Sequence, residues 1–398
     1  MPRLTAAELA SRAGQPPALV ERLVALAILR PREPDAFGPG DVAVVRLLAA
    51  FEESGIALED LAEGVASGEI DYGVVGRYFS EAPAATGTVD DLARRVNRPP
   101  ELVVRLLGAL GLPVPGPGAP IRDDEAETVA GLVHAWELLD DEELVRLARF
   151  QGDAMRKVAT VNIRFFEELV RQRVFRMDVT WEEGAALVEE LGLRATVFSR
   201  TLVDRLYGRH FEHALIQYMA DNTEDYLDER GIRARPARRP PAIAFLDLSG
   251  FTSLTEERGD TAAAALASRL ALVVAEASRS HGGQAVKWLG DGVMFHFDDP
   301  AAAVRCALEL VRRAREALEI PARVGVNSGP VVFQDGDYFG RTVNVAARIA
   351  DYARPGEVLV SRAVVAAGAP GELDYEPIGE IPLKGVGAPV ELLRARPR

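Results

Sequence analysis

The 398-residue chain contains a single cysteine, and this alone excludes an internal disulfide. Because disulfides are rare in reducing compartments, a chain of this kind is expected in the cytoplasm. The amino-terminal segment lacks the apolar core of a secretion signal, and no run of about 18 apolar residues predicts a membrane span. Cys306 itself lies within an apolar helical pattern, where we expect a small buried residue.

Basic residues are scarce relative to acidic ones. The chain has 46 Lys and Arg against 60 Asp and Glu, a net charge of −14 with neutral His. Phosphate contacts need clusters of Lys and Arg, so such a chain is a poor general partner for nucleic acid or for an anionic membrane. Its hydrophobic content of 48% is ordinary for a globular protein, and its length allows two or three domains.

An internal repeat occupies the first 150 residues. The segment that begins at Thr5 recurs at Thr88, an offset of 83 residues (from 5 to 88). Each copy predicts a Thr-capped helix, a proline-pair turn and a second helix, then a turn-rich stretch and a longer helix (42–51 and 125–138). We expect the first copy to bury Leu9 and Ala13 on one helix and Leu19, Leu23 and Leu26 on the next. The positions that are identical in the two copies are, in first-copy numbers, Thr5, Leu9, Ala10, Arg12, Pro16, Pro17, Leu19, Val20, Arg22, Leu23 and Leu29.

The layout of this repeat resembles the MerR-type winged helix-turn-helix, with one unit in residues 1–85 and another in 86–150. The resemblance would imply DNA binding, but the residues oppose that function. The recognition-helix candidates offer Arg22 and Arg105 as their cations, and each also carries an acidic residue, Glu21 or Glu101. We therefore expect a packing or sensing role for these helices, and we do not expect them to bind nucleic acid.

Residues 151–229 predict a regulatory or dimerisation region that is helical throughout from 153 to 228. A linker (230–241) follows, in which Gly231 ends the helix and several prolines prevent another from starting. Five arginines make this linker locally basic: Arg230, Arg233, Arg235, Arg238 and Arg239. We interpret it as a solvated hinge.

From residue 242 the apolar periodicity changes. Strands are predicted at 242–248, 285–289, 293–297, 323–328, 331–333 and 358–361, with a terminal pair at 381–383 and 390–393. Helices are predicted at 261–280, 301–318 and 342–352. This β-α-β-β-α-β order is the ferredoxin-like plan with a carboxyl-terminal extension. The whole chain is therefore predicted to be α+β, with an all-helical regulatory half before a ferredoxin-like domain (242–398).

Two aspartates end apolar strands in this last domain. Asp247 precedes Ser249 and Gly250, and Asp291 stands between two glycines at a predicted hairpin tip. If the strands are neighbours, both carboxylates meet at one edge and repel each other unless a cation neutralises them. Mg²⁺ prefers such oxygen ligands together with phosphates and water. The sequence therefore predicts a two-metal site for a nucleoside triphosphate.

Asn344 and Arg348 are four residues apart on a predicted helix and so share one face. An amide and a guanidinium placed in this way can stabilise negative charge that develops on a phosphorus atom. Any one of these residues could be an ordinary cap or turn residue. The complete set is what indicates phosphoryl chemistry.

Residues 242–398 resemble the catalytic domain of class III nucleotidyl cyclases, close to actinobacterial adenylate cyclases. The motifs that carry the resemblance are FLDLSGFT (245–252), VKWLGDGVMFHF (286–297) and DYFGRTVNVAAR (337–348). The resemblance implies that ATP is converted to 3′,5′-cyclic AMP and pyrophosphate through attack of the ribose 3′-hydroxyl on the α-phosphorus. It also implies two Mg²⁺ or Mn²⁺ ions and a head-to-tail homodimer with shared active sites.

The resemblance assigns roles to individual residues. Metal binding falls to Asp247 and Asp291, with Leu248, and charge stabilisation to Asn344 and Arg348. The remaining assignments are to substrate: Lys287 and Asp337 for adenine, Lys384 for the terminal phosphates, and Ser249, Gly250, Phe251 and Thr252 in the loop around the nucleotide. The family's pattern also allows a small-molecule or lipid regulator of the helical half. No side chain in the set is an obvious general base.

Three alternative functions stay open at this point. The domain could serve a transcription regulator as a nucleotide sensor, but the intact catalytic set and the acidic amino-terminal half oppose that. A guanylate cyclase is opposed by Lys287 and Asp337, and a diguanylate cyclase by the absence of a GGDEF run.

Overall fold

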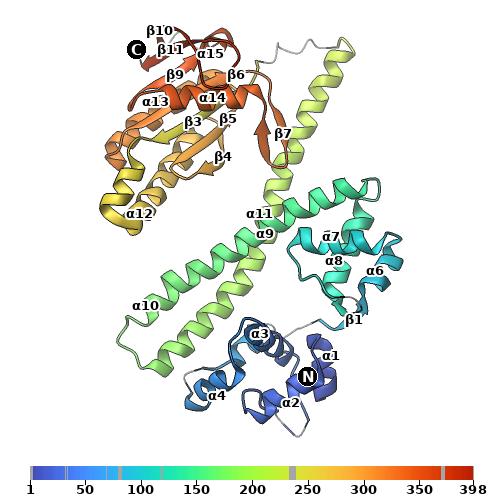
Figure 1. Cartoon of the computed structure of the whole chain (residues 1–398). Helices are drawn as coiled ribbons and strands as arrows, with labels where there is room; N and C mark the ends of the chain where they lie inside the picture. The colour runs from blue at the N-terminus through green and yellow to red at the C-terminus, as the bar shows by residue number, and fades with distance from the viewer. Residues whose placement is uncertain are drawn as a thin grey trace. The chain divides into compact units, whose positions relative to one another are not determined.

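The computed structural model describes residues 3–31, 33, 35–68, 70–78, 83–116, 118, 120–232, 239–368 and 373–397. The chain divides into two compact units, Met1–Tyr218 and Met219–Arg398 (Figure 1). The first is helical and the second is built on a mixed sheet, so the predicted α+β class is confirmed.

Both copies of the repeat begin in the same way. Thr5 caps α1 (Ala6–Ala13) and Thr88 caps α6 (Val89–Val96), each in a capping box with an acidic residue three positions later. A proline opens the next helix in each copy, α2 (Pro17–Ala25) and α7 (Pro100–Leu110). The first copy continues with α3 (Asp41–Glu53), α4 (Leu58–Ser67) and α5 (Gly73–Tyr78). The second contains the strand pair β1 (Ala85–Thr88) and β2 (Pro120–Arg122), then α8 (Asp123–Ala135).

Each copy encloses its own apolar core. Leu9 and Leu23 are buried in the first copy, and their counterparts Leu92 and Leu106 are buried in the second. Two details of the prediction were wrong. Leu26 is only half-buried because it caps the end of α2. The helix predicted to reach residue 138 ends at Ala135, and Leu138 is 95% exposed.

The sequence predicts that residues 153–228 are helical throughout. In the structure this region is interrupted. α9 (Asp141–Phe165) runs through a π-helical turn, η1 (Phe166–Arg171), into α10 (Gln172–Val174), and α11 (Trp181–Glu229) starts after a break at 175–180. Thr180 begins the new helix because its hydroxyl accepts from Glu183 N at 3.3 Å, while Glu183 Oε2 accepts from Thr180 N at 2.9 Å. This is the same capping box that opens α1.

The predicted end of this helical region is confirmed. α11 stops at Glu229, and Gly231 adopts a left-handed φ of +66°. Residues 233–238 of the predicted linker lie outside the described residues, and Arg233, Arg235 and Arg238 with them.

The second unit contains a seven-stranded sheet in the order β10-β11-β9-β6-β3-β5-β4. Four of its strands reproduce the predicted ferredoxin-like plan, because β6, β3, β5 and β4 are neighbours in that order and all antiparallel. The bounds of the seven strands are β3 (Ala242–Leu248), β4 (Gly283–Leu289), β5 (Gly292–Phe297), β6 (Ala322–Ser328), β9 (Val358–Ser361), β10 (Leu373–Ile381) and β11 (Val390–Pro397).

Helices cover both faces of this sheet. α12 (Phe251–Ser280) and α13 (Pro300–Arg313), which continues as η2 (Ala314–Leu318), share a core with Ala244 and Leu246 of β3. α14 (Arg341–Tyr352) packs with Ile243 and Met294 on the opposite face. Successive strand residues point to opposite faces, so Asp247 belongs to the face that α14 covers. Cys306 is fully buried in the α13 core, as predicted, and burial raises the pKa of its thiol to about 12.

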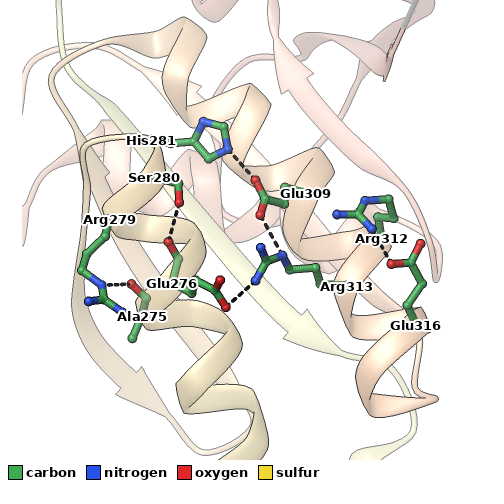
Figure 2. Close-up of polar contacts among 9 residues, drawn as sticks. All are labelled: Ala275, Glu276, Arg279, Ser280, His281, Glu309, Arg312, Arg313 and Glu316. Atoms are coloured by element: carbon green, nitrogen blue, oxygen red, sulfur yellow. Dashed lines mark hydrogen bonds and ion pairs between the residues drawn. The ribbon is translucent and has the colours of Figure 1, made fainter.

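A chain of charged contacts joins α12 to α13 (Figure 2). His281 Nε2 lies 2.7 Å from Glu309 Oε2, Glu309 also pairs with Arg313 at 2.7 Å, and Arg313 Nη1 donates to Glu276 Oε2 at 2.8 Å. Within Thr255–Ser280 of α12, an 18-residue stretch with a mean hydropathy of 1.3 is long and apolar enough to cross a membrane. In this structure Leu270 and Val274 are buried against the sheet, and we therefore assign this segment to the core of the domain.

Two further predictions in this unit needed correction, and two elements were not predicted. The first strand of the terminal pair is Leu373–Ile381 rather than 381–383, because Pro377 and Gly379 form a bulge within a strand. α12 begins at Phe251, and the predicted start at 261 marks only its second segment, after non-helical Gly259. The sequence did not reveal β8 (Asp337–Phe339), which pairs with β7 (Val332–Gln334), or α15 (Arg362–Ala366).

Candidate active site

The two predicted aspartates lie side by side at the end of neighbouring strands. Asp247 is opposite Gly292 in the pairing of β3 with β5, and Asp291 immediately precedes Gly292. Gly250, with a φ of +90°, turns the chain from β3 into α12. A cavity of about 490 Å³, the metal-loop cavity, opens here; its lining residues are Asp247, Leu248, Ser249, Gly250, Phe251, Asp291, Arg323 and Pro355. The side chain of Thr252 lies outside the described residues.

Arg323 is the charged residue of this cavity that the sequence analysis missed. It lies opposite Asp247 in the pairing of β3 with β6, and its Nε and Nη2 approach Asp247 Oδ2 at 2.8 and 2.6 Å. Its Nη1 also donates to the carbonyl oxygen of Asp351 at 2.9 Å, at the carboxyl end of α14. The only signal in the sequence was an arginine at the start of a strand. Its partner became visible once the register of β3 and β6 was known.

The electrostatics of the cavity fit a divalent cation. Burial raises the pKa of the Asp291 carboxyl, and the charge on Asp247 raises it further. Ser249 Oγ is buried and has no hydrogen-bond partner. Among the described residues no three or more His, Cys, Asp or Glu side chains gather as a metal site. Two carboxylates and an unpaired hydroxyl suit Mg²⁺, which completes its shell with water and phosphate.

Asn344 and Arg348 share the exposed face of α14, as predicted. Val343, Ala346 and Ile349 lie on the buried face of the same helix. A second cavity of about 440 Å³, the α14 cavity, brings Asn344 and Arg348 together with Lys384 from the β10–β11 connection and with Asp247. Arg348 Nη1 donates to Asp351 Oδ2 at 2.8 Å, and both of these side chains are largely exposed. Asp247 thus lines both cavities.

The two residues predicted to select the base form a separate pair. Lys287 Nζ on β4 donates to Asp337 Oδ2 on β8, and the side chains are 38% and 23% exposed. Asp337 Oδ1 also accepts from Tyr338 N at 2.8 Å. The Tyr338 ring stacks on His296 with centroids 4.2 Å apart, and burial lowers the pKa of His296. Neither Lys287 nor Asp337 lines the metal-loop cavity or the α14 cavity.

The chain is similar to known proteins both in this region and beyond it. The family model "Adenylate and Guanylate cyclase catalytic domain" matches residues 237–393. An adenylate cyclase of Streptomyces coelicolor is 30% identical over 279 residues, which cover 68% of this chain and 68% of that protein. An uncharacterized protein of Mycobacterium tuberculosis is 28% identical over 362 residues, 86% of this chain and 88% of that protein. The match to the crystal structure of the adenylyl cyclase CyaB from P. aeruginosa covers 40% of this chain and 94% of the CyaB chain. Its TM-score is 0.37 and its sequence identity is 24%.

Proposed function

Because this chain belongs to the family of adenylate and guanylate cyclases, we propose that it is an adenylate cyclase, which converts ATP to 3′,5′-cyclic AMP and pyrophosphate. The observation that carries the proposal is the place of Asp247. It contributes to a cavity with a second carboxylate and an arginine, and to another with Asn344, Arg348 and Lys384. This edge of the sheet therefore presents both kinds of group that the reaction needs, acidic ligands for a metal and donors for phosphate oxygens.

Each group has a chemical task in this proposal. Asp247 and Asp291 would hold the divalent ions, and Arg323 would keep the Asp247 carboxylate oriented towards them. Two Mg²⁺ or Mn²⁺ ions bound there would lower the pKa of the ribose 3′-hydroxyl and offset the charge of the leaving pyrophosphate. Gly250 allows the loop after β3 to approach the phosphates, and Ser249 offers its hydroxyl as a hydrogen-bond donor to them.

Asn344 and Arg348 would donate to the oxygens of the α-phosphorus as negative charge builds in the transition state. Lys384, from the β10–β11 connection, would hold the terminal phosphates. The Lys287–Asp337 pair offers a donor and an acceptor to the edge of a purine, and the name of the Streptomyces relative supports adenine as that purine.

We also propose that a second copy of the chain completes each site. Asn344 and Arg348 are exposed, and the base-selecting pair lies outside both cavities of its own chain. Two copies arranged head to tail would place the metal-loop residues of one against the remaining groups of the other. In this scheme the helical residues before the linker regulate turnover.

The test is cyclic nucleotide formation by the purified full-length chain, supplied with ATP or GTP and with Mg²⁺ or Mn²⁺. We expect cyclic AMP from ATP, little cyclic GMP from GTP, and no product after a chelator removes the metal. Faster turnover of GTP would contradict the substrate. Absence of product with either nucleotide, also after residues 1–234 are removed, would contradict the activity.

A further inference from the structure

A buried polar cluster fixes the first turn of α14 to the sheet. Asn327 on β6 is 8% exposed, and its Nδ2 donates to the Thr342 carbonyl oxygen at 3.1 Å. Ser361 on β9 donates from its Oγ to Asn327 Oδ1 at 2.7 Å. Thr342 Oγ1 in turn donates to the Pro330 carbonyl oxygen at 2.7 Å. The Asn327 amide is thus bonded on both sides, to strand β9 and to helix α14.

The same helix lies directly on β6 without intervening side chains. A Cβ added to Gly325 would lie 2.1 Å from Ala350 N and 2.7 Å from Ala346 O. A Cβ added to Gly329 would lie 2.7 Å from Thr342 Oγ1. The backbone of α14 is therefore in contact with β6 at Gly325, and the Thr342 side chain in its first turn is in contact with Gly329 just after β6. Such close contact leaves little room for α14 to shift against β6.

The position of this cluster relates it to the proposed chemistry. Thr342 precedes Asn344 by two residues, and Arg348 follows Asn344 by one turn of the same helix. Thr342 belongs to the buried face of α14 and Asn344 to the exposed face. A hydrogen bond to the first turn limits both the rotation of α14 about its axis and its movement along β6. These two motions would displace Asn344 and Arg348 most directly.

The polar character of the cluster is informative, since its surroundings are apolar. Ile243, opposite Asn327 on β3, and Leu359 on β9 are fully buried, and Val345 is buried on the helix. A buried amide contributes little net stability, and apolar residues of similar shape are often as stable in such a place. The amide instead fixes the orientation of the elements around it, because its donor and its acceptor must each face a partner.

We propose that Asn327, together with Thr342, is a positioning residue that sets the placement of Asn344 and Arg348 for the transition state. The inference rests on the function proposed above. Asn327 touches neither nucleotide nor metal in this scheme, and its effect reaches the reaction through the α14 backbone. Removing its bonds should weaken transition-state stabilisation and leave the binding of ATP largely unchanged.

Two variants break the cluster at different bonds. Asn327→Ala removes both bonds of the amide, and Thr342→Val removes the hydroxyl with little change in shape. Thr342→Ser keeps the hydroxyl and should restore activity. Val274→Ala, in the α12 core on the other face of the sheet, is the control for loss of stability without any contact to α14. All four are made in the full-length chain.

The first measurement separates kcat from the KM for ATP. We expect Asn327→Ala and Thr342→Val to lower kcat roughly 10- to 100-fold with KM within about 2-fold, as for a small misplacement of catalytic groups. Thr342→Ser should recover most of kcat. Val274→Ala should lower the melting temperature and leave kcat near the wild-type value. The inference fails if kcat falls in step with the melting temperature across all four variants.

The second measurement does not depend on activity. Amide hydrogen exchange in a peptide covering residues 341–352 should be faster in Asn327→Ala and Thr342→Val than in the wild type or in Val274→Ala. Unchanged exchange in that peptide would overturn the positioning role, whatever the enzyme does. A wild-type chain that forms no cyclic nucleotide would instead overturn the proposed function, and the exchange result would still decide whether Asn327 holds α14.

Discussion

The two sides of the candidate site are held in different ways. On the metal-loop side, Asp247 is half-buried and is contacted by two nitrogens of Arg323. Burial raises the pKa of Asp291 beside it. On the α14 side, Asn344 and Arg348 are exposed, and Arg348 contacts a neighbour on its own helix. The metal-loop geometry is therefore fixed by contacts among strand residues, whereas the α14 groups depend on how the helix is placed and, in our proposal, on a second copy.

The largest effect should come from the metal-loop side. Asp247→Ala or Asp291→Ala removes one of two carboxylates that would hold the metal ions, and we expect cyclic AMP formation to fall by roughly 1,000-fold or more. The exposed Asp260 on α12 provides a matched control, since Asp260→Ala changes charge equally outside the cavity. Activity retained in either cavity variant would show that the carboxylates are structural.

Loss of the α14 groups should be severe but smaller. Asn344→Ala and Arg348→Ala each remove a donor to the transition state, and removing one such donor typically lowers kcat about 100- to 1,000-fold. Arg341→Ala, an exposed arginine on the same helix, tests for general effects of lost charge. If the KM for ATP rises while kcat is unchanged, these residues bind substrate without favouring the transition state.

Base selection should be separable from both sides, because Lys287 and Asp337 lie outside both cavities. Lys287→Glu combined with Asp337→Cys should move the ratio of ATP to GTP turnover towards GTP by roughly 10-fold. Lys287→Glu alone would place two carboxylates together and should be less active than the double variant. An unchanged ratio in the double variant would mean that this pair does not contact the base.

The smallest effect should come from the contact that holds Asp247. Arg323→Lys keeps the positive charge but cannot make two parallel bonds to the carboxylate, so we expect activity to fall about 10-fold. The metal concentration needed for half-maximal activity should rise in parallel. If activity falls with no change in metal requirement, Arg323 acts on substrate rather than through Asp247.

Local patterns in the sequence were enough to predict much of this site. Asp247 and Asp291 end strands that proved to be neighbours, and a spacing of four residues was enough to place Asn344 and Arg348 on one helix face. The ferredoxin-like order followed from the alternation of strand and helix periodicity. In each case the relevant contacts lie within one element or between strands whose order a common plan dictates.

Contacts that depend on strand register or on distant pairing could not be predicted. Arg323 meets Asp247 only because of the β3–β6 register, and Lys287 meets Asp337 across 50 residues of chain. Asn327 is polar, and nothing in its sequence neighbourhood indicates that it is buried. The break at 175–180 was missed because a capping box that begins with Thr180 lies inside an otherwise helical pattern.

The most direct test of the shared site combines the two sides. Asp247→Ala and Asn344→Ala chains should each be nearly inactive, and an equal mixture should regain up to about a quarter of wild-type cyclic AMP formation, because half of the dimers would be mixed and would carry one intact site of two. Each mixed dimer would join an intact metal loop from one copy to an intact α14 from the other. A mixture that stays as inactive as its components would contradict the shared site and place all catalytic groups within one chain.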